Sequence, residues 1–518
     1  MKQTNNETKK TSFAGTAVLM GSMILLSKVL GLVRDTLVGR AYGTSMEAIA
    51  YETASKLPVT VFDLVIGGVV TSAFIPVYNG LLVKKGRQEA LDFARSYTSL
   101  ICLITTVLAA LGIVFASPLV SWMAPGLDEA THGLAVQLVR ILFPMVIFTG
   151  LAFSFVGYLQ SNGEYNIPAI ISLLSNGIMV GYLLTLNKVC GIVGLAVAML
   201  LGWAAQALVQ VPSLRRLAFS WKPTRLWTPP IRQAMTNALP ILLSTWTTPV
   251  CSLINTRLAS GIENGRGITA LGYANRLYTI LVGLFSFVAT NLLFPHFSRA
   301  AAAGEQDETD RLMRVSVKTL VFIIAPLTAG IVLLATPFTA LLFEGGSFTP
   351  DDTALTAGAL SCYALSMVFL AVNEVLIKGF FAAEKTKVPM VSALIAMAVN
   401  VGLLLVVAEL WQDRLTVGVI ALLSGVATAV NMTINAIRAA RCRMMRFDRR
   451  DWLEIGKILV CTVGMVPAVW LVHRWIDGNF LEVAVGAFVG ILVYALLTTL
   501  VRCETMGMLW NFVRRRKS

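Results

Sequence analysis

The sequence is poor in charge and in histidine. Charged residues make up 14% of the 518 residues, whereas 56% are hydrophobic, and the mean hydropathy is +0.74. A water-soluble domain carries about 25% charged residues, so this composition excludes a soluble enzyme. The 42 basic and 28 acidic residues give a net charge of +14. The basic residues stand in short clusters between apolar runs, which is typical of loops beside a membrane and argues against nucleic acid as a partner.

Motifs for metals, disulfides and catalysis are also missing. The chain has three histidines, and its seven cysteines are scattered singly with no CxxC pair. Neither a disulfide framework nor a metal site is therefore expected. No G-x-x-x-x-G-K-[ST] run is present to bind ATP, and no nucleophile–base spacing appears near a membrane interface. We expect a membrane protein that is not an enzyme and uses no cofactor.

Long apolar runs are what the sequence has instead. A membrane-spanning helix needs about 20 mostly apolar residues, and fourteen segments meet this requirement. The polar first ten residues are not followed by a small-residue cleavage site, so we expect the first span to be an uncleaved helix. The fourteen spans lie near residues 13–34, 54–80, 97–117, 136–160, 167–187, 190–213, 233–256, 269–296, 316–343, 355–381, 388–409, 415–437, 454–473 and 480–501.

The loops between these spans alternate in charge. Lys and Arg gather in every second loop and in the tail, as in the clusters at 84–95, 215–225 and 438–450, whereas loops such as 117–133 are nearly free of them. Because cytoplasmic loops carry the basic excess, both termini are expected in the cytoplasm. An even number of spans is then required.

An internal repeat divides the chain. Pro76 and Pro295 lie near the ends of equivalent spans, 219 residues apart, and Pro118 and Pro337 repeat the same offset. Two bundles of six helices in the same orientation are expected, related by a pseudo-twofold axis along the membrane normal, with a site between them. The alternative is a membrane scaffold whose repeat only records gene duplication. The predicted parts are residues 1–220 (spans 1–6), 221–445 (spans 7–12) and 446–518 (spans 13–14 and a basic tail).

Cationic residues occur inside several spans. Lys28, Arg34, Lys56, Arg257 and Arg276 all lie in or at the end of apolar runs. Ionisable groups inside a membrane usually face a cavity or a partner, although those near helix ends can extend to the headgroups. Cations around a cavity between the bundles would suit an anionic substrate such as a diphosphate.

Four strings resemble those of the MurJ/MviN family of lipid II flippases, within the multidrug/oligosaccharidyl-lipid/polysaccharide exporter superfamily. They are LLSKVLGLVRD (25–35), SKLP (55–58), SAFIPV (72–77) and YANRL (273–277). The resemblance implies the plan of six, six and two helices, and a central cavity whose basic residues bind the diphosphate of lipid II. Carried over by motif, the expected substrate-binding residues are Lys28, Arg34, Lys56 and Arg276, with Asp35, Asn275 and Arg257 in support.

The sequence departs from the family pattern at three positions. Phe62 stands where an arginine is expected, Gly67 where an acidic residue is expected, and Asn275 where an aspartate precedes the arginine. If the cavity geometry is retained, Phe62→Arg is expected to be neutral or to improve activity on lipid II. These departures put the identity of the cargo in doubt more than the fold.

The leading hypothesis is a flippase that moves an undecaprenyl-diphosphate-linked peptidoglycan precursor, lipid II, from the inner to the outer leaflet of the bacterial cytoplasmic membrane by alternating access. The expected partners are lipid II, membrane lipids and other proteins of peptidoglycan synthesis. One alternative keeps the fold and changes the cargo to another polyprenyl-linked oligosaccharide or a drug. Another is a scaffold for cell-wall synthesis that does not transport.

Overall fold

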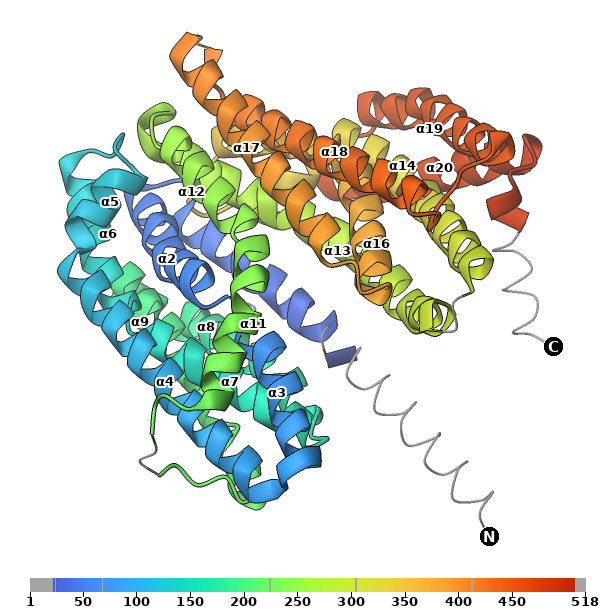
Figure 1. The fold of residues 1–518 in the computed structure, drawn as a ribbon. Coiled ribbons are helices and arrows are strands. Elements are labelled where there is room, and N and C mark those ends of the chain that lie inside the picture. The colour runs from blue at the N-terminus through green and yellow to red at the C-terminus, as the bar shows by residue number, and fades with distance from the viewer. Residues whose placement is uncertain are drawn as a thin grey trace. The chain divides into compact units, whose positions relative to one another are not determined.

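The computed structural model describes residues 22–23, 25–67, 69–222, 225–302, 305–410 and 414–507. These residues are almost entirely helical, and the only extended pairing among them is an isolated bridge between Gly345 and Phe348. The chain divides by contacts into two compact units, Met1–Arg257 and Leu258–Ser518. Figure 1 shows the course of the helices along the chain.

The described part of the first unit begins with a helix over residues 25–42, which is followed by the eleven helices α2 to α12. The last of them, α12, ends two residues after the unit boundary at Arg257. Their bounds are α2 Met46–Val65, α3 Val69–Lys85, α4 Arg87–Val114, α5 Ala116–Met123, α6 Glu129–Leu142, α7 Met145–Ser161, α8 Asn166–Thr185, α9 Asn187–Leu208, α10 Val211–Arg216, α11 Pro229–Thr245 and α12 Thr247–Ala259.

The described part of the second unit includes a short 3-10 turn and the α-helices α13 to α20. Their bounds are η1 Glu263–Gly265, α13 Arg266–Ala302, α14 Gln306–Phe343, α15 Pro350–Ala364, α16 Met367–Ala382, α17 Lys387–Leu410, α18 Val417–Arg441, α19 Arg449–Trp475 and α20 Asn479–Leu500.

The predicted spans fall on these helices. Nine helices within the described ranges are long and apolar enough to cross a membrane, and α15 with α16, bent by 47° at their junction, form a tenth such segment. Each predicted span overlaps a helix or a pair of consecutive helices, although part of the first lies outside the described residues. The all-helical, multi-span class is confirmed. The total of fourteen, the two six-helix bundles and the boundaries at residues 220 and 445 stay predictions.

Polar side chains cap the N-termini of several helices. Ser45 accepts a hydrogen bond from the N–H of Ala48 at the start of α2, and Thr349 and Asp448 form capping boxes with Asp352 and Asp451. These side chains satisfy N–H groups that a helix leaves unpaired in its first turn.

Asp128, the last residue of the loop before α6, caps the N-terminus of that helix. Its carboxylate accepts from the Thr131 hydroxyl and from the N–H groups of Thr131 and Ala130, and these hydrogen bonds hold the pKa of the carboxyl below its ordinary value. The charged form suits the positive end of the helix dipole.

Aromatic residues form the centre of the first unit. The Phe74 ring lies 5.2 Å from that of Tyr97 and 5.4 Å from those of Tyr78 and Phe93, and Tyr78 meets Tyr158 at 5.5 Å. Aromatic pairs at these separations contribute beyond the area they bury. They join α3, α4 and α7, which lie side by side (Figure 1).

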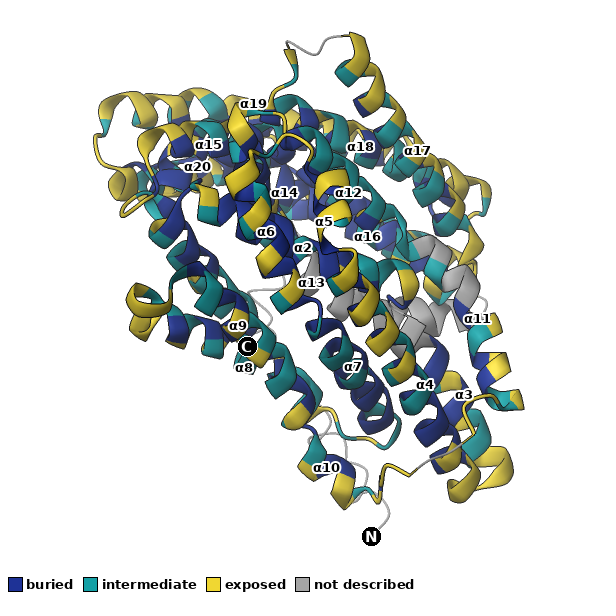
Figure 2. Cartoon of the chain, turned by 90° about the vertical axis from the view of Figure 1, so that its left-hand side faces the viewer, coloured by how far each residue is buried: buried dark blue, intermediate teal, exposed yellow. Residues whose placement is uncertain are grey.

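The last two helices pack against α14 in the second unit. Buried Lys318 of α14 meets buried Asp451 of α19 at 2.6 Å, and Arg314 meets the other carboxylate oxygen at 2.9 Å. The Tyr494 hydroxyl of α20 donates to the carbonyl of Phe322 at 2.9 Å. Figure 2 shows exposed residues along α19 and α20. Many of these exposed residues are apolar, such as Val460 and Ile491, as expected of a surface covered by lipid.

Candidate functional site

The helix over residues 25–42 carries the first group of predicted site residues. Arg34 donates to Asp35 from Nε and Nη2, at 3.0 and 2.7 Å, and from Nη1 to the side-chain oxygen of Asn176 on α8, at 2.8 Å. Asn176 in turn donates to the carbonyl of Ser27 at 3.2 Å. A guanidinium has five N–H groups, and these three hydrogen bonds leave two for a ligand.

Asn176 was not predicted as part of the site. It is a buried amide within a mostly apolar span, and an amide in such a run is the signal that sequence reasoning had available. Its role is to orient Arg34, because its side chain connects α8 to the start and the middle of the first helix. A guanidinium fixed in this way presents its remaining N–H groups in one direction.

Lys56 lies on α2 and is already paired. Its Nζ is 3.1 Å from Oε1 of Glu52, one turn earlier, and the Glu52 side chain is 6% exposed. The i, i+4 spacing of the two residues indicates this pair in the sequence, although Glu52 was not among the predicted site residues. An anionic ligand at Lys56 therefore competes with the Glu52 carboxylate.

Arg257 lies against α5. Its guanidinium carbon is 5.7 Å from the centre of the Trp122 ring, and it donates a hydrogen bond to the Trp122 carbonyl. A cation over an indole face is favourable, so the structure gives Arg257 a packing role. Its predicted support of the substrate site stays a prediction.

The second unit carries the remaining two predicted residues. Asn275 is exposed and Arg276 is half-buried on α13, with the Arg276 guanidinium 5.9 Å from the centre of the buried Tyr273 ring. Lys28, Arg34, Asp35, Lys56 and Arg257 belong to the first unit. The convergence of both sets on one cavity stays a prediction.

The second unit also contains a buried network of neutral polar residues that the sequence analysis missed. Asn435 donates to the side-chain oxygens of Asn373 and Asn431, at 2.8 and 3.2 Å, and accepts from the Ser392 hydroxyl at 2.7 Å. These contacts join α16, α17 and α18. Because both ends of the Asn435 amide are occupied within the protein, the network holds the helices together rather than offering a ligand site.

No group of three or more histidine, cysteine, aspartate or glutamate side chains in the described part of the chain is arranged to hold a metal ion.

Comparison with known proteins decides the family. The sequence profile of the lipid II flippase MurJ family matches residues 38–494. The chain belongs to the MurJ family. A probable lipid II flippase MurJ from Rhizobium meliloti (strain 1021) is 30% identical over 404 residues, which cover 74% of each chain.

Two solved structures have a similar fold. An inward closed conformation of a lipid II flippase MurJ matches with a TM-score of 0.81 at 22% identity, over 93% of this chain and 98% of the other. An inward-facing multidrug resistance transporter of the MATE family, in the MOP superfamily, matches with a TM-score of 0.69 at 15% identity, over 83% and 98% of the two chains. The chain therefore shares its fold with these two solved structures.

The departures from the MurJ pattern at Phe62 and Gly67 have structural reasons. Phe62 is 3% exposed and stacks on Phe153 with ring centres 6.2 Å apart. The expectation that an arginine is tolerated at this position is corrected, because it would bury an unpaired charge in the core. Gly67 has a φ of +42°, and an added Cβ would lie 2.7 Å from the Asp63 carbonyl oxygen, so an acidic side chain does not fit there.

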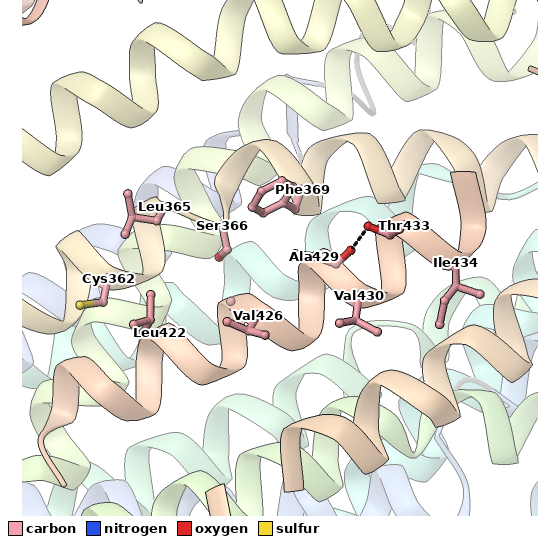
Figure 3. A pocket seen from close by; sticks show the side chains of 11 residues that line it. Cys362, Leu365, Ser366, Phe369, Leu422, Val426, Ala429, Val430, Thr433 and Ile434 are labelled. Carbon is pink, nitrogen blue, oxygen red and sulfur yellow. Dashed lines mark hydrogen bonds between the residues drawn. The ribbon is translucent and has the colours of Figure 1, made fainter. Parts of the chain in front are cut away.

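An apolar groove lies on the second unit between the α15–α16 junction and α18. It has a volume of about 340 Å³, and its lining, from Cys362 and Leu365 to Thr433 and Ile434, contains no charged side chain. Figure 3 shows Phe369 and Ser366 on one side and Val426 and Val430 on the other, with the Thr433 hydroxyl turned to the Ala429 carbonyl. This groove is unsuited to a diphosphate.

Proposed function

We propose that this protein is a flippase that carries lipid II, the undecaprenyl-diphosphate-linked peptidoglycan precursor, from the inner to the outer leaflet of the bacterial cytoplasmic membrane. The observation that carries the proposal is the match to the lipid II flippase MurJ family over residues 38–494. The match in fold to MurJ and MATE transporters supports alternating access as the mechanism. No bond of the cargo is made or broken, so the protein acts as a transporter.

The architecture proposed with this function has fourteen spans and both termini in the cytoplasm. Spans 1–6 fall in residues 1–220, spans 7–12 in 221–445, and the last pair in 446–518. Basic side chains at the last turns of α3, α10 and α18 support this orientation, since these helices end the even-numbered spans 2, 6 and 12 and their ends therefore lie on the same side of the membrane.

The diphosphate is proposed to bind Lys28, Arg34, Lys56 and Arg276. Arginine offers a planar pair of donors to phosphate oxygens, and lysine offers a mobile point charge. Arg34 is already oriented by Asp35 and Asn176 and keeps two N–H groups for the ligand. Lys28 and Arg276 stand at family motif positions. As the units rock, these cations are proposed to stay with the diphosphate while the polyprenyl tail remains in the bilayer.

Partners other than the cargo are proposed from its chemistry. The polyprenyl tail keeps the cargo among membrane lipids, which cover the apolar outer faces of the helices. Proteins of peptidoglycan synthesis supply lipid II on one side and consume it on the other, and they are the proposed protein partners. The proposal requires no cofactor or metal for the binding of the diphosphate itself.

Complementation of a flippase-depleted bacterial host tests this proposal. Loss of one charge-assisted phosphate contact costs about 1.5–3 kcal/mol, or one to two orders of magnitude in affinity. Arg276→Ala and Lys28→Ala should therefore fail to support growth although both proteins reach the membrane. Lys28→Arg should support growth, as should Arg311→Ala, which removes an arginine with 70% of its side chain exposed. Normal growth with both alanine variants would show that these two cations do not carry the substrate, whereas a wild type that fails to support growth would favour the scaffold without transport.

A further inference from the structure

The second predicted span is broken near its middle. α2 ends at Val65 and α3 begins at Val69, and Gly67 between them has a φ of +42°. The N–H groups of Ile66 and Gly67 both bond to the carbonyl of Phe62, at 2.8 and 3.0 Å. In an unbroken helix the Gly67 N–H would bond to the Asp63 carbonyl instead. At the break, the Asp63 carbonyl oxygen therefore does not accept the helical hydrogen bond from the Gly67 N–H.

A second helix junction meets this break within the same unit. Trp246, between α11 and α12, donates its indole N–H to the Leu64 carbonyl at 2.7 Å. The neighbouring Thr245 has its hydroxyl oxygen 3.2 Å from the position that a Gly67 Cβ would take, and that hydroxyl donates to the Leu242 carbonyl at 2.8 Å. Because the proton of Thr245 is used in this way, its oxygen lone pairs face the break as acceptors.

Asp63 brings a negative charge to this place. Its side chain is half-buried, and within the described part of the chain its carboxylate has no hydrogen bond or ion pair. The cation on the same helix, Lys56, is seven residues away, or about 10 Å along the axis, and pairs with Glu52. A carboxylate inside a membrane span is costly and usually has a partner or an aqueous cavity.

The helix end adds to the negative potential. The C-terminal end of a helix carries about half a negative charge, and α2 ends two residues after Asp63. The carboxylate and carbonyl of Asp63 and the hydroxyl of Thr245 are oxygen ligands of the type that hard cations prefer. Unwound carbonyls and helix C-terminal ends hold coupling cations in transporters built from discontinuous helices.

We propose that the break between α2 and α3 binds one monovalent metal cation such as Na⁺, with the Asp63 carboxylate as the charged ligand and the Asp63 carbonyl and Thr245 hydroxyl as neutral ligands. The binding is a property of the first unit alone. Its use as an energy source rests on the proposed function, since a cation that binds at the break in a helix of a rocking bundle couples its gradient to the motion.

Ion binding to the purified full-length protein tests the site without any cargo. Thermal unfolding is measured in increasing NaCl, with choline chloride keeping the ionic strength constant, and radioactive Na⁺ binding gives the stoichiometry. The wild type should show a saturable rise in melting temperature and bind one Na⁺. Asp63→Asn should lose both responses and should be more stable than the wild type without Na⁺, because a neutral amide is less costly to bury than an unpaired carboxylate.

Two further variants separate the site from general effects. Glu47→Gln, which neutralises a carboxylate in the first turn of the same helix, should respond to Na⁺ as the wild type does. Thr245→Val keeps the charge and should raise the half-saturating Na⁺ concentration about threefold to tenfold, as expected for one lost neutral contact.

The comparison of the wild type with Asp63→Asn decides whether the proposed Na⁺ site exists. Equal Na⁺ responses in the wild type and in Asp63→Asn would overturn the proposal. So would a wild type whose melting temperature changes with pH but is the same in NaCl as in choline chloride. These measurements contain no lipid II, so a failure here leaves the proposed flippase function standing. A failure of complementation by the wild type would in turn leave a measured Na⁺ site in place.

Discussion

The Arg34 guanidinium donates from Nη1 to the side-chain oxygen of Asn176 at 2.8 Å, across 142 residues of sequence. This contact ties the first helix of the unit to α8 and fixes the direction in which Arg34 presents its free N–H groups. A cation oriented before the ligand arrives loses less side-chain entropy on binding. The pair therefore connects the packing of the first unit to the proposed diphosphate site.

Removal of the Asn176 amide should weaken both packing and activity. Asn176→Ala takes away one acceptor from Arg34 and the donor to the Ser27 carbonyl, and we expect a loss of about 1–2 kcal/mol in the free energy of unfolding. Complementation should fall while membrane levels hold. Asn166→Ala, at the exposed start of the same helix, should leave thermal stability and growth unchanged. Full activity of Asn176→Ala would show that the orientation of Arg34 is not needed.

The topology makes a prediction for two loops. A reporter fused at Asp351, in the acidic first turn of α15, should lie outside the cytoplasm, and one fused at Arg443, after α18, should lie inside. The reason is the basic excess of cytoplasmic loops. Two reporter enzymes, one active only inside the cytoplasm and one active only outside it, are fused at each position to determine its side of the membrane. If both fusions report the same side, the count of spans between them is wrong.

An arginine at position 62 should destabilise the protein. Phe62→Arg removes a ring stacked on Phe153 and buries an unpaired charge, so we expect a loss of about 3 kcal/mol or more. Phe62→Leu keeps an apolar side chain and should cost less than about 1.5 kcal/mol. Thermal unfolding in detergent and the amount of protein in the membrane check both variants. A stable Phe62→Arg protein would mean that the position faces water.

The ion pair between α14 and α19 should contribute strongly to stability. Asp451→Asn takes away the charged partner of buried Lys318 at 2.6 Å and leaves only the exposed Glu504 carboxylate at 4.0 Å. Breaking a buried pair on one side costs about 3–5 kcal/mol. Glu308→Gln, which removes an exposed partner of Arg311, should change stability by less than about 0.5 kcal/mol. Limited proteolysis should cut the loop before α19 faster in Asp451→Asn. Equal cleavage of both variants would show that apolar packing alone holds the last two helices.

Hydropathy predicted the helices because each apolar run is long enough to cross a membrane, and this property is local. The breaks at Gly67 and Trp246 were not predicted, since each depends on a hydrogen bond or a close contact between residues about 180 positions apart. The pair Arg34–Asp35 follows from adjacency, but the contribution of Asn176 does not.

The burial of site residues and the pairing of their charges could not be predicted from the sequence. Phe62 looks like a substitution in a cavity, yet it lies in the core because α2 turns it toward Phe153. Glu52 stands four residues before Lys56, a spacing that indicates a pair, but which cations share their charge with carboxylates depends on rotamers and neighbours. Those are set by tertiary packing.

The distribution of lipid II between leaflets tests the central claim most directly. The protein is depleted in its native host, and lipid II on the outer leaflet is measured by its accessibility to an impermeant enzyme that cleaves it. The account predicts that the outer pool falls and the inner pool rises on depletion, and that the wild type restores both whereas Arg276→Ala does not. An outer pool that stays unchanged in depleted cells would contradict the account.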